Sequence, residues 1–400
     1  MNFRYRGVIP ASKSLMNRAL ICSSYTQDLQ IEGHSSCDDV IKMQRALQVL
    51  AASSNRGTEQ AVYDCGAAGT VLRFLSLRLS RLPGVHVLKG TERLMQRPQQ
   101  DLLDLFKRLE VRYETSQEHL TLHSKGWQNL QEPVVVHRTV SSQFASGLLL
   151  NAWELPHDLH LQMSGEPMSE GYLEMTLKLV KQLGMNIQIT SEGLLIPAHS
   201  RISQKKYQAE SDLSSLFAIA AFAALNGEAH FESYPHPSLQ PDSEFLEFFQ
   251  RMGIEHELKS STLTVSPTTR FKGLNASLKS CPDLFPVLAV LCSFAESPSH
   301  LHSASQLIHK ESNRIAKTSE LLSKAGIRNE PLSDGMIIHP GPKQFSQSSA
   351  FSYDTDHDHR LAFAAALLKS QGAPVHIEHP EVVNKSFPEF WQVVGLPPNS

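Results

Sequence analysis

Cations and hydroxyl groups occur together near the expected start of a helix early in the sequence. Ser14 can cap this helix, and Arg18 follows four residues later. The hydroxyl, the guanidinium and the positive end of the helix dipole would then share one patch, which suits a phosphate or a carboxylate. The alternative is an ordinary capped first turn that faces solvent.

Further segments in the first half of the chain offer similar chemistry. Small residues from Gly66 to Thr70 would let the backbone approach a ligand closely, although a single Gly-rich turn is a weak signal. Arg97 precedes Pro98 and an expected helix over 101–108, where a lone arginine could equally be a surface residue. Serines also precede two expected helices. Ser141 and Ser142, with Gln143, come before a helix that begins near 144, and Ser169, with Tyr172, comes before one that begins near 173. Each serine could bind an anion or simply cap its helix.

Carboxylates accompany the cations in the second half of the chain. Lys310 and Arg314 are expected one turn apart on a helix that runs to Ala325, with Glu311 beside them. Glu311 could transfer protons among these cations, or all three could form ion pairs on a solvated face.

Residues 354–360 are also dense in charged groups and precede an expected helix over 361–368. If the segment is extended, His357 and His359 share one face, which makes a metal site conceivable. No further ligand cluster supports such a site, so we expect no metal. We expect instead that the Arg360 guanidinium binds an anionic ligand.

The composition sets broad limits on the function. A chain of 400 residues is too long for one ordinary core, which indicates two domains. The formal charge of −3 gives no net bias toward nucleic acid or an acidic membrane, and the five cysteines form no CxxC pair. Without an apolar run of about 20 residues or a secretory signal, we expect a cytoplasmic protein.

A helix that ends at glycine and leads into a strand recurs along the chain. The clearest turns are at Gly184, Gly253 and Gly326, with Glu110 in the same place in a fourth copy. These positions are 74, 69 and 73 residues apart. Less clear copies of the same turn near Ala51 and Gly395 suggest about six α+β repeats in total. The alternative is that such transitions arise by chance in any α/β protein. A boundary is expected near 210, where Asp212 can cap an apolar helix over 216–225.

Taken in order, these segments closely resemble the 5-enolpyruvylshikimate-3-phosphate (EPSP) synthase family. The matching motifs span residues 10–388 and are Pro10 to Arg18, Gly66 to Thr70, Arg97 before proline, Ser141 to Phe144, Asp283 after proline, Lys310-Glu311 with Arg314, Asp358 to Arg360, and Lys385 to Pro388.

The resemblance implies an α/β fold. It would be a two-domain inside-out α/β barrel in which each domain holds three βαββαβ units. Residues 1–9 with 211–400 would form the first domain, and residues 10–210 the second. The active site would lie in a cleft between them, and the domains would close around both substrates.

The resemblance also implies transfer of the enolpyruvyl group of phosphoenolpyruvate to the 5-hydroxyl of shikimate 3-phosphate, in the pathway to chorismate and the aromatic amino acids. The enzyme would be a transferase that acts as a monomer, without cofactor, metal, nucleic acid or membrane. Phosphoenolpyruvate would bind Lys13, Gly69, Arg97, Gln143, Arg314, Arg360 and Lys385. Shikimate 3-phosphate would bind Ser14, Arg18, Ser141, Ser142, Gln143, Ser169, Tyr172, Asp283 and Lys310.

By the same resemblance, three residues of the matching motifs would carry the chemistry. Glu311 would move protons to and from the methyl carbon, Asp283 would take the hydroxyl proton, and Lys13 would assist the departure of phosphate. Whether one residue serves two steps stays open.

Four departures from the family pattern stand near these positions, at Ala67, Glu170-Gly171, Gln306 and Asn313. Two rival interpretations stand beside this one, a related transferase that shares the fold and a non-catalytic paralogue that the departures allow. A UDP-N-acetylglucosamine enolpyruvyl transferase would have Lys-Asn early in the chain and a cysteine in its first half, whereas Ser14 follows Lys13 and no cysteine lies between Cys65 and Cys281. A non-catalytic paralogue would lack the proton-transfer residues, yet Asp283 and Glu311 are present.

Overall fold

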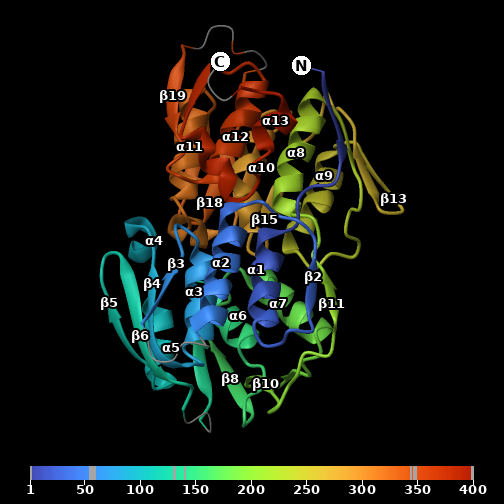
Figure 1. Cartoon of the computed structure of the whole chain (residues 1–400). Coiled ribbons are helices and arrows are strands. Elements are labelled where there is room, and N and C mark those ends of the chain that lie inside the picture. The colour runs from blue at the N-terminus through green and yellow to red at the C-terminus, as the bar shows by residue number, and fades with distance from the viewer. Residues whose placement is uncertain are drawn as a thin grey trace. The chain divides into compact units, whose positions relative to one another are not determined.

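The computed structural model describes residues 2–53, 60–128, 132–138, 141–342, 345 and 349–397. The chain divides into two compact units. Unit 1 comprises Met1–Pro10 and Glu210–Ser400, and unit 2 comprises Ala11–Ala209. These limits differ by one residue from the domain limits that the resemblance implies. Figure 1 shows both units as mixtures of helices and strands, so the fold is α/β.

Unit 1 contains two four-stranded sheets and one two-stranded sheet among the described residues. The sheet orders are β1-β12-β14-β13, β15-β16-β18-β17 and β19-β20. In chain order the elements are β1 (Phe3–Gly7), α8 (Leu213–Asn226), β12 (Gly227–Phe231), η1 (Pro241–Glu244), α9 (Phe245–Met252), β13 (His256–Lys259), β14 (Thr262–Val265), β15 (Asn275–Ser277), η2 (Pro282–Leu284), α10 (Phe285–Cys292), β16 (Ser299–His302), η3 (Ser305–His309), α11 (Arg314–Lys324), β17 (Asn329–Leu332), β18 (Gly335–Ile338), β19 (Phe351–Asp354), α12 (His359–Ser370), β20 (Val375–Glu378), η4 (Pro380–Lys385) and α13 (Phe390–Val394).

Three apolar helices form the centre of unit 1. Every residue of α10 is buried, as are nearly all residues of α8 and α12. Figure 1 shows the three helices side by side, and each packs on the other two. A helix that is apolar on all sides needs neighbours all round, whereas α9 and α11 bury one face and keep polar residues on the other. The sequence pattern therefore separates central helices from peripheral ones.

Unit 2 has the same kinds of sheet. Their orders are β3-β4-β6-β5, β7-β8-β10-β9 and β11-β2. The elements are α1 (Lys13–Ser23), β2 (Gln30–Glu32), α2 (Asp38–Ser53), β3 (Ala61–Asp64), α3 (Gly69–Leu79), β4 (Pro83–Lys89), α4 (Glu92–Gln96), α5 (Gln100–Arg108), β5 (Arg112–Thr115), β6 (His119–Lys125), β7 (Val134–His137), α6 (Gln143–Leu150), β8 (Leu159–Ser164), α7 (Glu170–Gln182), β9 (Gln188–Ile189), β10 (Gly193–Ile196) and β11 (Lys206–Gln208).

The expected repeat is present, but its internal order differs from the expected βαββαβ. In both units each four-stranded sheet follows the order βαβαββ, as in β3-α3-β4-α5-β5-β6. The first two strands of each such copy are parallel and need a crossover helix, whereas the last two form an antiparallel hairpin. The sheets of the described residues are separate rather than joined in one closed barrel.

The repeat signal itself comes from the end of the second helix in each copy. Gly184, Gly253 and Gly326 follow α7, α9 and α11 with φ of +114°, +80° and +75°. Glu110 takes the same left-handed conformation after α5, with φ of +57°. Glycine adopts this conformation at little cost, which explains the pattern in the sequence.

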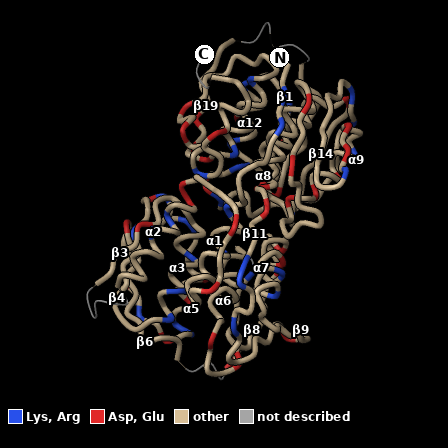
Figure 2. Tube along the Cα trace, turned by 45° about the vertical axis from the view of Figure 1, so that its right-hand side comes forward, with Lys and Arg blue, Asp and Glu red and all other residues tan. Residues whose placement is uncertain are grey.

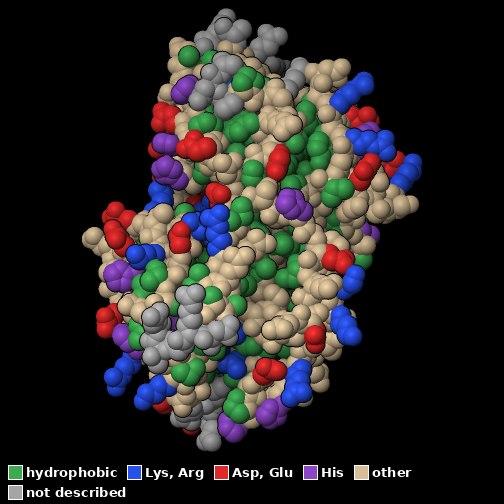
Figure 3. All heavy atoms as spheres, viewed as in Figure 1, with side chains coloured by type: hydrophobic (Ala, Val, Ile, Leu, Met, Phe, Trp, Pro, Cys, Tyr) green, Lys and Arg blue, Asp and Glu red, His purple; other side chains and the backbone are tan. Residues whose placement is uncertain are grey.

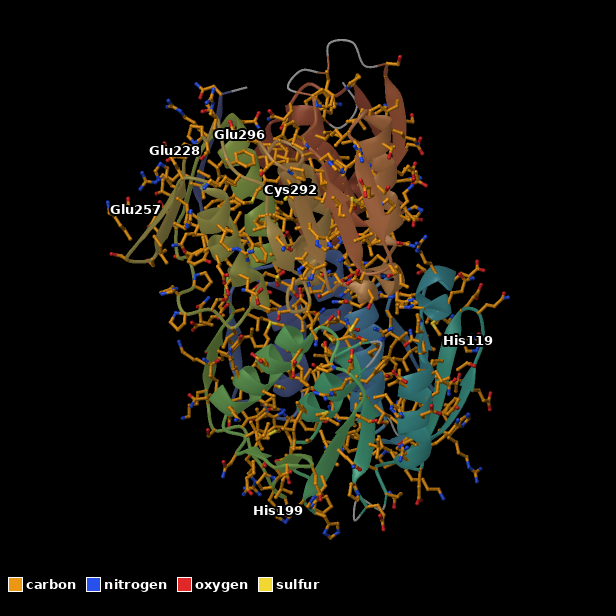
Figure 4. All side chains as sticks on the ribbon, turned by 180° about the vertical axis from the view of Figure 1, so that it is seen from behind. His119, His199, Glu228, Glu257, Cys292 and Glu296 are labelled. Carbon is orange, nitrogen blue, oxygen red and sulfur yellow. The ribbon has the colours of Figure 1, made fainter. Side chains whose placement is uncertain are left out.

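The cysteines lie in the interior of the two units. All five are free and buried, and Cys292 lies among the helices of unit 1 (Figure 4). Burial raises the pKa of the Cys292 thiol to about 12. Such thiols are unreactive at neutral pH.

Charged residues of both signs are distributed through each unit. Figure 2 shows basic and acidic positions interspersed along the trace, and Figure 3 shows the same on one face of the surface. Within the part of the chain that the structure describes, no helix combines the length and apolar character needed to span a membrane.

Candidate functional site

Unit 1 holds a compact cluster of charged side chains, which we call the unit 1 cluster. It contains four cations and three carboxylates, namely Lys310, Arg314, Arg360, Lys385, Asp283, Glu311 and Asp358. They come from the ends of η2, η3, α11, α12 and η4 and from the residues beside them. Segments up to 102 residues apart in the sequence, from Asp283 to Lys385, therefore meet at one place in unit 1.

Arg314 is the centre of this cluster. Its side chain is 1% exposed, and three of its nitrogens donate to three different carboxylates. Nε donates to Asp358 Oδ2 at 2.7 Å, Nη1 to Asp283 Oδ1 at 2.8 Å and Nη2 to Glu311 Oε2 at 2.9 Å. Burial alone would lower the pKa of Arg314, but the three carboxylates raise it above its ordinary value. A permanent positive charge is thus fixed between the two predicted proton-transfer groups.

The other cations bind the same carboxylates. Arg360 Nη2 donates to Asp283 Oδ2 at 2.8 Å, and Lys310 Nζ lies 3.5 Å from Asp283 Oδ1. Lys385 Nζ lies 3.5 Å from Glu311 Oε1. The cations outnumber the carboxylates by one, so the cluster favours a further anion.

These contacts fix the ionisation of Asp283. Burial would raise the pKa of its carboxyl group, but the charges of Arg360, Lys310 and Arg314 hold that pKa well below its ordinary value. Asp283 is therefore a carboxylate at neutral pH.

The lowered pKa of Asp283 predicts how the free energy of unfolding depends on pH at the acid end. A carboxyl group whose pKa is lower in the folded state stabilises the fold above its unfolded pKa of about 3.9, and this contribution disappears as the pH falls through the folded pKa. Between pH 4 and 3 the wild-type free energy of unfolding should fall more steeply than that of Asp283→Asn. Urea titrations at several pH values test this, and equal slopes would contradict it.

The helix near this cluster begins later than expected. α11 starts at Arg314 and is capped by Asn313, whose side-chain oxygen accepts from the Ala316 amide at 3.1 Å. Lys310 and Glu311 lie in the connection before it, so Lys310 and Arg314 do not form the expected pair on one helix. Two residues of the 354–360 segment, Asp356 and His357, also have left-handed conformations, and α12 begins at His359.

In unit 2 the helix that carries the first cations is capped by a different serine from the expected one. Ser12, not Ser14, precedes α1, and its hydroxyl accepts from the Leu15 amide. Both residues are serines, so the sequence alone could not decide between them. Lys13 is the first residue of the helix, and its Nζ lies 3.1 Å from Asp39 Oδ2 with both side chains at least 90% buried. Asp39 thus holds Lys13 in place.

Arg18 is a buried residue rather than part of an exposed patch. Nε donates to Thr176 Oγ1 at 2.7 Å, while the other nitrogens donate to the carbonyls of Ser14 and Tyr172. Burial lowers the pKa of Arg18 to about 10, so it stays charged at neutral pH. Arg18 therefore connects α1 to α7, which brings the predicted ligands Ser14 and Tyr172 together.

Gly69 and Arg97 lie against each other in unit 2. Gly69 is the first residue of α3, and a Cβ atom placed on it would lie 2.8 Å from Arg97 Nη1. The absence of a side chain at Gly69 thus leaves room for the guanidinium.

Arg73, on the same helix, links several predicted ligands. It donates to Gln143 Oε1 at 2.8 Å and to the Pro98 carbonyl at 3.0 Å, one residue after Arg97. Its guanidinium also stacks on Phe144. Arg73 therefore fixes Gln143 and the segment that carries Arg97.

The predicted serine ligands lie at the starts of two helices. Ser141 and Ser142 precede α6, and the Ser141 hydroxyl accepts from the Gln143 amide at 3.2 Å. Ser169 precedes α7, which begins at Glu170 and contains Tyr172. Helix starts offer amides that could bind an anion, so the anion-binding role of these serines stays a prediction.

No group of three or more potential metal ligands gathers within the described ranges. His357 instead stacks on His379 at 4.6 Å between ring centroids.

Sequence reasoning missed three residues that hold the predicted ligands in place. Asp39 and Arg73 were assigned no role, and Asp358 was quoted within a motif but not as the partner of Arg314. Arg73 follows the Gly66 to Thr70 motif and Asp358 stands inside another, which was the one available signal, whereas nothing in the sequence marks Asp39. Their partners lie 70, 44 and 26 residues away, respectively.

Comparisons with known proteins agree on one family. The family model of EPSP synthase (3-phosphoshikimate 1-carboxyvinyltransferase) matches residues 8–394. A 3-phosphoshikimate 1-carboxyvinyltransferase of Bacteroides fragilis is 30% identical over 96% of this chain and 92% of its own length. One from Methanosphaerula palustris is 31% identical over 96% and 95%.

Solved structures share the fold at lower identity. EPSP synthase from Acinetobacter baumannii superimposes with a TM-score of 0.74 at 19% identity, covering 98% of this chain and 95% of its own. The enolpyruvyl transferase NikO from Streptomyces tendae gives a TM-score of 0.69 at 14% identity, covering 99% and 94%. The fold is therefore shared by transferases with different names.

Proposed function

Because the chain belongs to the EPSP synthase family, we propose that it transfers the enolpyruvyl group of phosphoenolpyruvate to the 5-hydroxyl of shikimate 3-phosphate and releases inorganic phosphate. The observation that carries this proposal is the unit 1 cluster, which places two carboxylates on one central arginine and surrounds them with three more cations. A reaction between two multiply charged anions needs this excess of fixed cations.

The unit 1 cluster and the ligands of unit 2 would act on the same pair of substrates. In unit 1, Arg314, Arg360 and Lys385 would bind phosphoenolpyruvate, and Lys310 would bind the acceptor. In unit 2, Lys13, Arg97 and Gln143 would contribute to phosphoenolpyruvate, and the serines to the acceptor. Bidentate arginines suit carboxylate and phosphate groups, which supports this assignment.

The reaction proceeds by addition and then elimination. Glu311 delivers a proton to the methylene carbon of phosphoenolpyruvate while the acceptor oxygen bonds to the neighbouring carbon and its proton passes to Asp283. The bond from that carbon to the phosphate oxygen then breaks, and the methyl group returns a proton to Glu311. Lys13 stabilises the charge on the departing phosphate.

The contacts of Asp283 explain how one carboxylate could be both ionised and basic. Without substrate, its three cations hold its pKa well below the ordinary value, which makes it a weak base. Substrate anions that draw Arg314 and Arg360 toward themselves would weaken those contacts and raise its basicity. The base would thus be activated when both substrates are bound.

Substituting Gly69 tests whether the Arg97 guanidinium binds phosphoenolpyruvate. We expect Gly69→Ala to raise KM for phosphoenolpyruvate about tenfold, equal to about 1.4 kcal/mol, because the added carbon would displace the guanidinium. KM for shikimate 3-phosphate should change less. Steady-state kinetics with each substrate varied in turn measure both constants.

Gly90→Ala is the matched control. Its added carbon would meet Leu94 Cδ2 at 3.0 Å and Met95 Sδ at 3.2 Å, which are the ends of two apolar side chains rather than a guanidinium. Equal effects of the two substitutions on KM for phosphoenolpyruvate would contradict the assignment of Arg97.

Phosphate release from the purified protein tests the function. Release should require both phosphoenolpyruvate and shikimate 3-phosphate, and UDP-N-acetylglucosamine should not replace the acceptor. Release with UDP-N-acetylglucosamine alone would favour the rival transferase. Binding of shikimate 3-phosphate without any release would favour a non-catalytic protein.

A further inference from the structure

The two helices that begin at the predicted acceptor ligands of unit 2 start at serines that do not cap them. Ser142 and Ser169 precede α6 and α7, and neither side chain caps its own helix. Ser12, Asp212, Asn313 and Asp358 do cap theirs. Ser169 is also in the left-handed conformation, with φ of 54° and ψ of 42°, which is sparsely populated for serine.

The predicted ligands at these two starts carry no charge. Ser141, Ser142 and Ser169 offer hydroxyl groups, and the helix ends add only partial charges. A phosphate monoester carries about −1.5 to −2 charges at neutral pH. A full positive charge beside them would complete the site.

Arg138 supplies that charge. Its backbone is fixed to the segment before Ser169, because its amide donates to the Ser164 carbonyl and its carbonyl accepts from the Met168 amide, both at 3.0 Å. In the sequence it also lies three residues before Ser141. Arg138 is thus fixed beside the segment that leads into α7, and it lies close in the sequence to the start of α6.

The present contacts of the Arg138 guanidinium are long. Nη2 donates to the Gly165 carbonyl at 3.4 Å, and Nη1 lies 3.8 Å from Glu170 Oε1. Nε is buried and has no hydrogen-bond partner in the structure, while the side chain as a whole is 21% exposed. Donors are therefore available for a stronger acceptor.

Glu170 occupies the position that such an acceptor would take. It lies in the first turn of α7, where the helix dipole favours a negative charge, and its side chain is 44% exposed. A phosphate group has more charge and matches the fork of an arginine better than one distant carboxylate does. The phosphate could therefore displace Glu170 from Arg138.

We propose that Arg138 binds the phosphate group of the phosphorylated acceptor, exchanging the Glu170 carboxylate for it. The inference rests on the proposed function and deepens it, since it identifies the group that distinguishes a phosphorylated acceptor from an unphosphorylated one. Glu170 then acts as a counter-charge that is released when the acceptor binds.

Titration calorimetry with shikimate 3-phosphate and with unphosphorylated shikimate tests this on the whole chain. We expect Arg138→Ala to weaken binding of shikimate 3-phosphate about 10- to 100-fold and to leave the weaker binding of shikimate unchanged. Glu170→Gln should strengthen binding of shikimate 3-phosphate several-fold, because it removes the competing charge. Arg112→Ala, on the exposed edge strand β5, is the control and should change neither affinity.

Equal losses for both ligands in Arg138→Ala, or no loss for either, would overturn the proposal. If Arg138→Ala does not fold, Glu170→Gln decides alone, and weaker or unchanged binding of shikimate 3-phosphate would overturn it. Failure of the proposed function looks different, because wild-type protein would then release no phosphate whatever the affinities of the variants. In active protein, kinetics should show a raised KM for shikimate 3-phosphate in Arg138→Ala with KM for phosphoenolpyruvate unchanged.

Discussion

Glu311→Gln should lower kcat by about 10²- to 10⁴-fold, the range that a positioned acid or base contributes. In the wild-type protein Glu311 Oε2 accepts from Arg314 Nη2 at 2.9 Å. Glutamine has nearly the same shape and can still accept this hydrogen bond, but it cannot deliver and recover a proton. Affinity for shikimate 3-phosphate should therefore persist. Steady-state kinetics and calorimetry on the same preparation separate the two effects.

Glu320→Gln is the matched control for this variant. Glu320 lies on α11, shortly after Glu311 in the chain, but it pairs with Lys317 and Lys324, outside the unit 1 cluster. Its substitution should leave kcat within about twofold, because exposed ion pairs contribute little. A Glu311→Gln variant as active as Glu320→Gln would remove Glu311 from the mechanism.

Asp358→Ala should produce the largest loss of stability, about 3–5 kcal/mol, because it leaves the buried Nε of Arg314 without its carboxylate partner. Asp358 is fully buried, accepts from Arg314 Nε and Nη2, and also caps α12 through the Arg360 amide. Arg314 would lose its fixed orientation, so activity should fall as well. Urea denaturation followed by circular dichroism measures the change in stability.

The effect of losing a helix cap alone can be measured separately. Asn313→Ala removes the cap of α11 without removing a charge, and should cost about 1 kcal/mol. If Asp358→Ala costs no more than Asn313→Ala, the ion pair with Arg314 contributes no stability, and our account of the cluster is wrong.

Local signals in the sequence predicted much of the fold. Glycines in the left-handed conformation after α7, α9 and α11 revealed the repeat, because a helix end must satisfy its last carbonyls locally. The order of elements within a copy, which only the family resemblance implied, was wrong, and the strand pattern itself does not separate parallel from antiparallel pairs. Asn313 as the start of α11 was missed because Lys310 and Glu311 also favour helices.

The candidate ligands could be named from motifs, but their partners could not. Arg314 donates to Asp358 across 44 residues, and Arg73 donates to Gln143 across 70. Neither pair leaves a periodic signal in one sequence. The contacts of Arg138 with Gly165 and Glu170 became visible only when two distant segments were placed side by side.

The most direct test of the central claim is the mass of the acceptor after reaction in deuterated water. We expect shikimate 3-phosphate to gain one enolpyruvyl group for each phosphate released, with deuterium in its methylene carbon, because Glu311 adds a solvent-derived proton and later removes one from the resulting methyl group. An unchanged acceptor despite phosphate release would show hydrolysis of phosphoenolpyruvate instead. A product without deuterium would contradict addition and elimination through a methyl group.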